Sequence, residues 1–227
     1  MDLPDLDPDP HTQFDRWFEE AKAAGVPYPN QMALATTTND AVPSVRMVLL
    51  KGHDARGFVF YTNRTSRKAA ELEANPRAAA ALYWELQDRQ VRVEGTVEPV
   101  ADGESLAYFR TRPRDSQVGA WASPQSHTVT SRAELEQRVT EVDRRFADEE
   151  DVPLPPFWGG YRIVATAIEF WQGQPNRLHD RLLYELSGGV WKRRRLAPYP
   201  SSFAPAGARA ALVYSPDAFQ RRYPFAP

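Results

Sequence analysis

The chain has 227 residues, of which 42% are hydrophobic and 26% are charged, and its formal net charge is −2 at pH 7. This length can bury one sizeable core, and the near-neutral charge argues against a nucleic-acid surface formed by global charge, so we expect no nucleic-acid partner. Because the chain contains no cysteine, disulfides and thiolate sites are excluded, and because its four histidines (His11, His53, His127 and His179) do not fall at ligand spacing, we expect no metal.

The first residues of the chain bear on its location. The sequence MDLPDLDPDP is acidic and rich in proline, unlike a secretory signal, and no later apolar run has membrane-spanning length. We therefore expect a leader over residues 1–10, no membrane partner and a cytoplasmic location.

Helical periodicity follows this leader. Over residues 11–24, Phe14, Trp17, Phe18 and Ala21 recur at helical spacing. This pattern predicts an amphipathic helix whose aromatic side chains face a core.

Strand patterns separated by turns come next. Three strands, over residues 32–38, 42–51 and 57–62, are expected to form an antiparallel meander. The remaining expected elements are a helix from Ser66 to before Asn75, strands over 79–86 and 89–100, helices over 102–112 and 131–147, and strands over 161–171, 181–186 and 190–196. This order predicts a mainly β fold with α-helices, an antiparallel β-barrel, in preference to a doubly wound sheet.

The end of the chain differs in composition from the rest. After Leu196 the sequence APYPSSFAPAG resembles a linker, because it is rich in proline, serine and alanine. We expect one folded domain over residues 1–198 and a C-terminal extension over residues 199–227 that is dispensable for the chemistry.

Three polar, arginine-bearing parts of the chain are candidates for one binding site. They are residues 46–51 (RMVLLK) with 60–68 (FYTNRTSRK), residues 112–126 (RPRDSQVGAWASPQS) and residues 171–181 (WQGQPNRLHDR). Together they predict a phosphate-binding pocket with aromatic sides. Because the chain has neither a G-x-G-x-x-G nor a G-x-x-x-x-G-K-[ST] loop, side chains must hold the phosphate.

Two pairs of cations stand out in these segments. Arg67 and Lys68 follow Ser66 at an expected helix start, where free backbone N–H donors favour a phosphate. Arg46 and Lys51 lie five residues apart on an expected strand, so we expect them to point to opposite faces. One ligand then reaches both only around the strand edge or at a subunit interface.

Each of these features also has a purely structural explanation when it is taken alone. The Ser-Arg-Lys sequence is then a solvated helix start, residues 112–114 are a proline-stiffened loop, His179 is a hydrogen-bonded strand histidine, and Trp171 belongs to the core. Their joint occurrence in a specific order favours the functional interpretation.

The order of these segments resembles one known family. The stretches that carry the resemblance are RMVLLK at 46–51, GFVFYTNRTSRKA at 57–69, RQVRVEG at 89–95, YFRTRPRDSQVGAWASPQS at 108–126, PLPPFWGGYR at 153–162, EFWQGQPNRLHDR at 169–181 and RLAP at 195–198. They closely resemble pyridoxamine 5'-phosphate oxidase. The resemblance implies a homodimeric FMN-binding split barrel with FMN at the subunit interface. It also implies oxidation of pyridoxamine or pyridoxine 5'-phosphate to pyridoxal 5'-phosphate by dioxygen, with release of hydrogen peroxide.

The resemblance further implies residue roles. FMN would be bound by Arg46, Met47, Val48, Leu49, Leu50, Lys51, Tyr61, Thr62, Arg67, Lys68, Gln90, Gln125, Ser126, Trp171 and Arg181. The substrate phosphate would be held by Lys51, Tyr108, Arg112 and Ser116. Arg177 and His179 would lie over the pyridine ring as catalytic residues.

Two other functions stay open at this point. One is a related flavin oxidase that acts on another ring, as in the phenazine-pathway relatives, although those tend to lose the RPRDSQ segment that this chain keeps at 112–117. The other is a non-catalytic carrier of FMN or pyridoxal phosphate, against which the intact Arg177 and His179 count.

Overall fold

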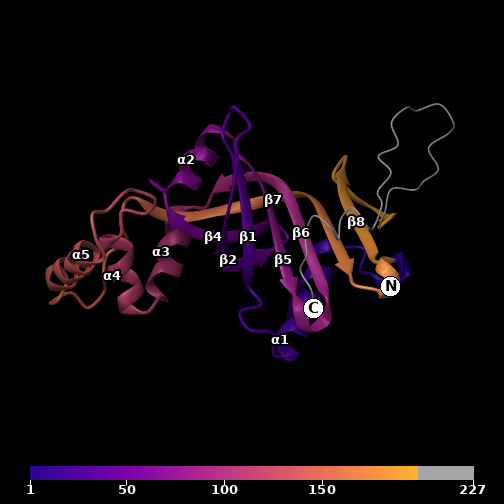
Figure 1. The fold of residues 1–227 in the computed structure, drawn as a ribbon, viewed down its shortest axis with the longest axis horizontal. Helices are drawn as coiled ribbons and strands as arrows, with labels where there is room; N and C mark the ends of the chain where they lie inside the picture. The colour runs from indigo at the N-terminus through magenta and orange to yellow at the C-terminus, as the bar shows by residue number, and fades with distance from the viewer. Residues whose placement is uncertain (199–227) are drawn as a thin grey trace, which may run out of the picture.

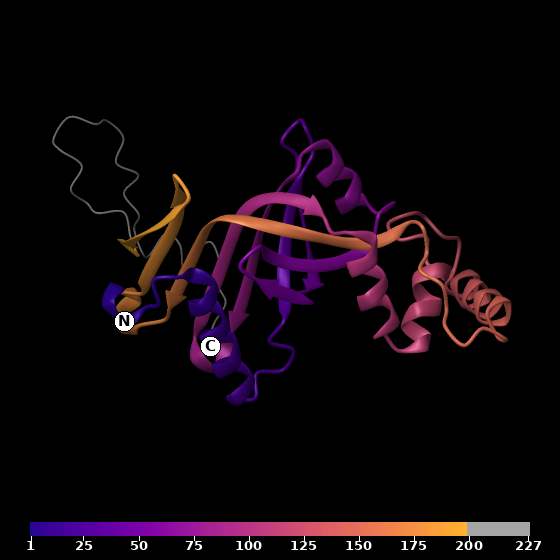
Figure 2. The same cartoon turned by 180° about the vertical axis from the view of Figure 1, so that it is seen from behind.

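A single curled antiparallel sheet dominates the computed structural model, which describes residues 1–198 (Figures 1 and 2). The strand order is β2-β1-β5-β6-β7-β4-β3, and β8 and β9 continue from β7 as a further hairpin. The strands are β1 (Gln31–Thr37), β2 (Pro43–Leu49), β3 (Gly52–Asp54), β4 (Gly57–Asn63), β5 (Arg77–Trp84), β6 (Arg89–Pro99), β7 (Trp158–Gln172), β8 (Asp180–Ser187) and β9 (Val190–Leu196). The predicted mainly β fold with helices is confirmed.

Three of the helices gather at one end of this sheet, and α1 and α2 lie against the sheet itself. Figure 1 shows α3, α4 and α5 together at one end, while α1 lies against the sheet nearer β8. The α-helices are α1 (Pro10–Ala23), α2 (Arg67–Ala74), α3 (Asp102–Arg110), α4 (Arg114–Ala122) and α5 (Arg132–Arg145), and short 3-10 helices are η1 (Leu3–Asp5), η2 (Glu85–Gln87) and η3 (Pro175–Arg177). Within the described residues, no helix is long and apolar enough to cross a membrane.

Helix α1 forms where the sequence predicts it and closes the main core. The Asp9 side chain accepts a hydrogen bond from the His11 backbone N–H, and Pro10 occupies the first turn, where a missing N–H costs nothing. Phe14 and Trp17 are fully buried against the sheet. Their ring partners include Phe58 of β4 and Phe170 of β7, so the helix ties both strands to one core.

The long strand β7 organises the rest of the molecule. It pairs with β6 along one edge, and along its other edge it pairs with β4 near its start and with β8 near its end. A β-bulge lies between Glu94 and Gly95 of β6, where a side chain on Gly95 would place its Cβ 2.1 Å from the Val164 carbonyl oxygen. Figure 1 shows β7 running from the helical end to β8.

The predicted meander over the first strands is wrong. β2 and β4, which a meander would place side by side, lie far apart in the strand order, and β4 pairs with β7 instead. Val59 and its neighbours Phe58 and Phe60 are all buried, so β4 needs cover on both faces, whereas β2 alternates between half-buried and exposed side chains and suits an edge. The edges of β2 and β4 are thereby left unpaired with each other.

Helix α4 is an element that sequence reasoning missed. Its buried face consists only of Gln117, Val118 and Ala122, too narrow a stripe to stand out among the polar residues of this segment. Val118 joins a second, smaller core with Phe109 and Trp158. The expected extension over residues 199–227 lies outside the described residues.

Candidate active site

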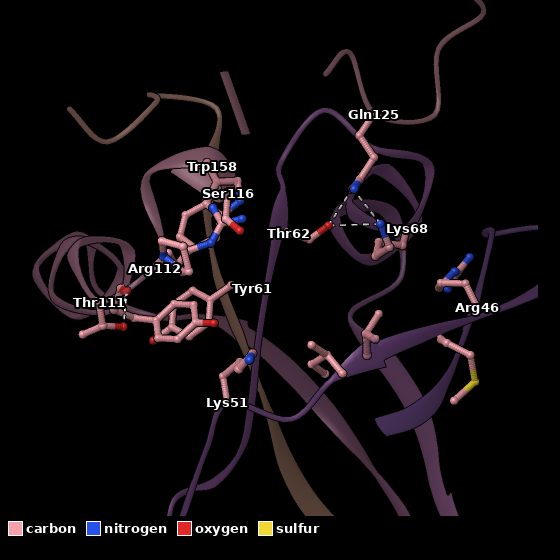
Figure 3. A pocket seen from close by; sticks show the side chains of 15 residues that line it. Arg46, Lys51, Tyr61, Thr62, Lys68, Thr111, Arg112, Ser116, Gln125 and Trp158 are labelled. Carbon is pink, nitrogen blue, oxygen red and sulfur yellow. Dashed lines mark hydrogen bonds between the residues drawn. The ribbon is translucent and has the colours of Figure 1, made fainter. Parts of the chain in front are cut away.

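A cavity of about 700 Å³ is lined by residues of β2 and β4 and by residues of α2, α3 and α4 (Figure 3). This volume is typical of a site for a small organic ligand. The predicted site residues that line it are Arg46, Met47, Val48, Leu49, Lys51, Tyr61, Thr62, Lys68, Tyr108, Arg112, Ser116 and Gln125. Two of the three candidate parts, residues 46–51 with 60–68 and residues 112–126, therefore meet in one pocket.

One side of the cavity is built around a buried lysine. The Lys68 ammonium donates to Thr62 Oγ1 at 3.0 Å and to Gln125 Oε1 at 2.9 Å (Figure 3). It also donates to Ser66 Oγ at 3.2 Å. All three acceptors are uncharged. Burial, with the charge of Arg46 as a second cause, lowers the pKa of Lys68 to about 8, and the carboxylate of Glu71 only partly opposes this.

The opposite side of the cavity carries a second cationic group. Arg112 lies over the Trp158 ring at 4.9 Å, beside Ser116, and its Nη1 is buried without a hydrogen-bond partner. Burial lowers the pKa of this guanidinium, which still stays charged at neutral pH. Lys51 completes the group, with its ammonium 5.8 Å from the centre of the Tyr108 ring. Within residues 1–198 no carboxylate lies within ion-pair distance of Lys51, Lys68 or Arg112.

Local hydrogen bonds fix the position of Arg112. The backbone N–H of Arg112 donates to the Phe109 carbonyl at the end of α3. The Gln117 amide of α4 donates to the carbonyls of Phe109 and Arg112 at 3.1 and 3.0 Å. Arg112 therefore lies in a turn between α3 and α4, and hydrogen bonds hold the loop predicted over residues 112–114 in place.

An aromatic wall joins the two cationic groups. The rings of Tyr61 and Tyr108 stack with centroids 4.1 Å apart, and Tyr61 lies 5.3 Å from Trp158 at an interplanar angle of 7°. Gly160 makes this packing possible, because a Cβ there would lie 2.7 Å from a Tyr61 ring carbon. The wall offers a flat, apolar surface between two regions of positive charge.

The expectation that Arg46 and Lys51 point to opposite faces is wrong. Strand β2 ends at Leu49, so Lys51 lies in the turn before β3. The alternation of side chains between the two faces of a strand therefore does not decide where the Lys51 side chain points. Arg46 and Lys51 both line the same cavity. No wrapping around a strand is needed to bring them to one ligand.

A second group of predicted residues lies at the other end of β7. Trp171 pairs with Gln90 across the β6–β7 ladder and with Arg181 across the β7–β8 ladder, and its ring lies 4.7 Å from that of His179. The Arg181 guanidinium donates to both oxygens of Glu169, at 2.7 and 3.1 Å. None of these residues lines the cavity described above.

The connection around Arg177 has an unusual backbone. Asn176 and Arg177 both have positive φ angles, of 58° and 59°. This conformation is strained for residues with side chains and tends to occur where function requires it. The Gln174 backbone N–H donates to His179 Nδ1 at 3.2 Å, so the neutral ring carries its proton on Nε2.

The two groups of residues are far apart within one chain. Trp158, in the cavity, and Trp171, in the second group, lie near opposite ends of the 15-residue strand β7. At about 3.3 Å per residue they are separated by roughly 40 Å along the strand. A single small ligand therefore does not touch both groups of one chain.

Three further predicted residues lie outside the cavity lining. Leu50 is buried beneath the turn and lines a smaller cavity with Phe18. Arg67 is exposed and paired with Glu71 at 2.8 Å. Ser126 follows Gln125 with a positive φ angle of 72°.

Sequence reasoning also missed residues that the structure places at the site. Thr111, Pro113 and Trp158 line the cavity. Trp158 lies within the PLPPFWGGYR segment that contributed to the family resemblance. The sequence therefore pointed to this segment, but no role was predicted for Trp158. Glu71, which accepts hydrogen bonds from Arg46 and Arg67, had no signal beyond its place on a buried helix face.

The edge strand beside the cavity exposes apolar side chains. Val45, Met47 and Leu49 of β2 are 68%, 61% and 39% exposed. These alternate residues project from one face of β2, and Met47 and Leu49 also line the cavity. A contiguous apolar stripe of this kind on an edge strand is typical of a protein interface.

Comparisons with known proteins match nearly the whole described chain. A family model described as pyridoxamine 5'-phosphate oxidase matches residues 18–146, and one described as the pyridoxine 5'-phosphate oxidase C-terminal dimerisation region matches residues 158–198. A pyridoxine/pyridoxamine 5'-phosphate oxidase of Rubrobacter xylanophilus is 61% identical over 192 residues, which are 85% of this chain and 88% of that protein. One of Cupriavidus taiwanensis is 57% identical over 195 residues, 86% of this chain and 91% of that protein.

Solved structures agree with these matches. PhzG from Burkholderia lata 383, in complex with tetrahydrophenazine-1-carboxylic acid, has a TM-score of 0.81 at 34% identity over 86% of this chain and 95% of its own. An FMN-binding protein related to pyridoxamine 5'-phosphate oxidase from Nostoc punctiforme has a TM-score of 0.66 at 16% identity over 82% of this chain and 97% of its own, and shows the fold alone. On the family models and the closely similar relatives, this chain belongs to the pyridoxamine 5'-phosphate oxidase family.

Proposed function

We propose that the chain is an FMN-dependent oxidase that converts pyridoxamine or pyridoxine 5'-phosphate to pyridoxal 5'-phosphate, with dioxygen as acceptor and hydrogen peroxide as product. The observation that carries this proposal is the presence of two separate cationic groups, around Lys68 and around Arg112, on opposite sides of one cavity. Two phosphate-bearing molecules require two such groups. The curated relatives carry the name of this activity.

The residues around Lys68 fit the phosphate of FMN. A buried ammonium that contacts only neutral oxygens lacks a counter-charge, and a phosphate dianion supplies one. Arg46 lies on the same side of the cavity and adds a second cation. Thr62 and Gln125 offer polar contacts to the ligand, and Arg67 lies at the N-terminus of α2, which favours anions.

The residues around Arg112 fit the phosphate of the substrate. The buried Nη1 of Arg112 lacks a partner, and Lys51, Ser116 and Tyr108 surround the same part of the cavity. These four side chains offer two charges and two hydroxyl groups. The aromatic wall between the two phosphate groups leaves room for flat rings to lie face to face.

The second group of residues completes the site in our proposal when it comes from a partner subunit. Within one chain it lies roughly 40 Å along β7 from the cavity. The apolar stripe of β2 supplies a surface for a partner beside the cavity, and the family model for dimerisation matches residues 158–198, which include β7, β8 and β9. The partner's Gln90, Trp171 and Arg181 would then contact FMN, with Ser126 and the turn at Leu50 nearby. The partner's Arg177 and His179 would lie over the pyridine ring.

The chain's own contribution to catalysis is then binding and orientation. When bound, FMN would supply a two-electron acceptor for a hydride from the substrate C4' carbon, and dioxygen would be reduced to hydrogen peroxide; with the amine substrate, water would replace the nitrogen, which leaves as ammonia. Lys51, Arg112 and Ser116 anchor the substrate phosphate, which fixes the distance of the ring from the flavin. The planar guanidinium of the partner's Arg177 would hold the ring from the other side, and the partner's His179, whose Nδ1 accepts from a backbone N–H, would donate to the ring through Nε2–H.

The similarity to PhzG supports a second candidate, an oxidase of another ring. That protein is 34% identical to this chain, and its bound ligand is a carboxylic acid. The presence of Lys51, Arg112 and Ser116 together favours a phosphate over a single carboxylate, because a dianion needs more than one cation. A non-catalytic carrier of FMN or pyridoxal phosphate is the third candidate.

Oxygen uptake by the purified, flavin-loaded protein separates these candidates. We expect uptake with pyridoxamine 5'-phosphate, formation of pyridoxal 5'-phosphate and an equal amount of hydrogen peroxide. Uptake with dihydrophenazine carboxylates alone would favour the second candidate. A protein that binds FMN tightly and consumes no oxygen with either substrate would be a carrier, and the proposal would be wrong.

Mixed dimers test the shared site. A heterodimer purified from cells that express Arg112→Ala and Arg177→Ala chains with different tags contains one site with both substitutions and one site with neither. We expect this heterodimer to recover about half of the wild-type activity, while each homodimeric variant is impaired. If each site were formed by one chain, the heterodimer would be as impaired as the two homodimers.

A further inference from the structure

Glu71 is a buried carboxylate close to the proposed FMN phosphate site. It lies on the inner face of α2 and is only 4% exposed. Its Oε2 accepts hydrogen bonds from Thr36 Oγ1 at 2.5 Å, from Ser44 Oγ at 2.6 Å and from Arg46 Nη2 at 3.2 Å. Its Oε1 accepts from Arg67 Nε at 2.8 Å. One carboxylate thus connects α2 with β1 and β2.

The contacts of Glu71 restrict the guanidinium of Arg46. Nη2 of Arg46 donates to Glu71 and to Ser44, and Nη1 donates to Thr36 at 2.5 Å and to the Leu34 carbonyl at 3.3 Å. These four bonds use the four hydrogens on the two terminal nitrogens, so that Nε–H is the donor left for a ligand. Arg46 is therefore fixed before any ligand binds, which removes an entropic cost from binding.

Glu71 also sets the charge of this region. Arg46, Arg67 and Lys68 carry three positive charges, and Glu71 offsets one of them. The remaining charge of +2 equals the charge of a phosphate dianion in magnitude. Burial would by itself raise the pKa of Glu71, but hydrogen bonds from Ser44, Thr36, Arg67 and Arg46 lower it to about 2, so the carboxylate stays ionised at any working pH.

We propose that Glu71 is a positioning residue of the phosphate site, which holds Arg46 and Arg67 in place. The inference rests on the proposed function, because it assumes that a phosphate of FMN binds beside Lys68. The two charged groups that face Lys68 act in opposite directions: Arg46 disfavours its proton and Glu71 favours it. Loss of the Glu71 charge therefore lowers the pKa of Lys68 further.

The test compares FMN with riboflavin, which lacks the phosphate, as ligands of the full-length flavin-free protein. Fluorescence titrations give both dissociation constants for the wild type, for Glu71→Gln and for Glu73→Gln. Glu73 is a matched control, because it lies on the same helix and is exposed. We expect Glu71→Gln to weaken FMN by about tenfold, the size of one charge-assisted contact, and to leave riboflavin unchanged, while Glu73→Gln changes neither.

The pH dependence separates positioning from simple loss of structure. In the wild type, FMN affinity should fall as Lys68 loses its proton near pH 8. In Glu71→Gln this fall should begin at a lower pH, because Lys68 no longer has the nearby carboxylate. If Glu71→Gln only loosened the structure around the site, the variant would bind FMN more weakly at every pH, and its FMN affinity would fall at the same pH as in the wild type. That result would overturn the inference.

The other outcomes are equally decisive. If the wild type binds riboflavin as tightly as FMN, the phosphate site of the proposed function is wrong, whatever Glu71 does. If the wild type prefers FMN and Glu71→Gln keeps the full preference or binds FMN more tightly, Glu71 is not a positioning residue. Should Glu71→Gln fail to fold, Ser44→Ala decides instead: the loss of one hydroxyl donor to Glu71 should weaken FMN by about threefold without effect on riboflavin, and an unchanged preference would refute the inference.

Discussion

Replacement of Lys68 by methionine should make the flavin-free protein more stable while it weakens FMN binding. Lys68 is a buried ammonium with three neutral hydrogen-bond acceptors, and its pKa falls from 10.5 to about 8. Since the folded pKa is lower than that of the unfolded chain, the unfolded chain binds this proton more tightly. The charge therefore lowers the free energy of unfolding below pH 8, and this loss disappears as the pH rises toward 10.5.

The magnitudes follow from these values. The depressed pKa of Lys68 corresponds to a stability cost of at most roughly 3 kcal/mol at pH 7. Lys68→Met removes this cost but also three hydrogen bonds, each worth at least about 0.5 kcal/mol, so we expect a net gain of up to about 1.5 kcal/mol, or a rise in melting temperature of up to roughly 6 °C. The loss of charge-assisted bonds to the FMN phosphate, at about 1.5–3 kcal/mol, should weaken FMN by roughly 10- to 150-fold.

Differential scanning fluorimetry and FMN titration measure both effects in the same preparations. Lys192→Met, at an exposed position of β9, is the matched control and should change neither quantity. At pH 10 the stability difference between the wild type and Lys68→Met should shrink. A flavin-free Lys68→Met protein that melts at or below the wild-type temperature at pH 7, or an equal loss of FMN and riboflavin affinity, would show that Lys68 is not an unpaired phosphate ligand.

Three further outcomes are expected. Arg112→Ala should mainly raise KM, because it removes a contact made equally in ground and transition states, whereas Arg177→Ala should mainly lower kcat; steady-state kinetics at matched FMN content tests both. A chain that ends at Pro198 should keep FMN and turnover. If the shortened chain lost flavin while its circular dichroism spectrum showed it to be folded, residues 199–227 would be part of the site. Burial lowers the pKa of both His11 and His53, so the fold binds their protons less tightly than the unfolded chain does, and stability should fall as the pH drops below 6.5. A His11→Leu variant should lose less melting temperature between pH 7.5 and pH 5 than the wild type does.

The elements of the fold were predictable because they follow local patterns. The spacing of Phe14, Trp17 and Ala21 predicts α1, and alternation predicts most strands to within a few residues. Strand pairing was less predictable, since neighbours in sequence need not be neighbours in a sheet. The pairing of β4 with β7 joins residues about a hundred positions apart, and only the two-sided burial of Phe58 and Val59 hints at it.

Most residues that line the cavity were predictable from the sequence, whereas the geometry of the cavity was not. The error about Arg46 and Lys51 arose because the expected strand ran two residues too far, and one residue of register reverses the direction of a side chain. Residue types and order also gave no sign that Arg177 and His179 lie far from Arg112 within one chain. The length of β7, 15 residues, sets the distance between Arg112 and the pair Arg177 and His179. Composition and residue spacing do not show that a strand of this length separates them.

The proposed sharing of one site between two subunits has consequences for stability. Lys68 is buried and Arg112 half-buried, neither has a carboxylate partner in the described chain, and Asn176 and Arg177 adopt strained backbone conformations. Each feature costs stability in the flavin-free monomer. A phosphate beside each cation and a partner subunit against Arg177 would offset these costs together, so flavin binding and subunit association should stabilise each other.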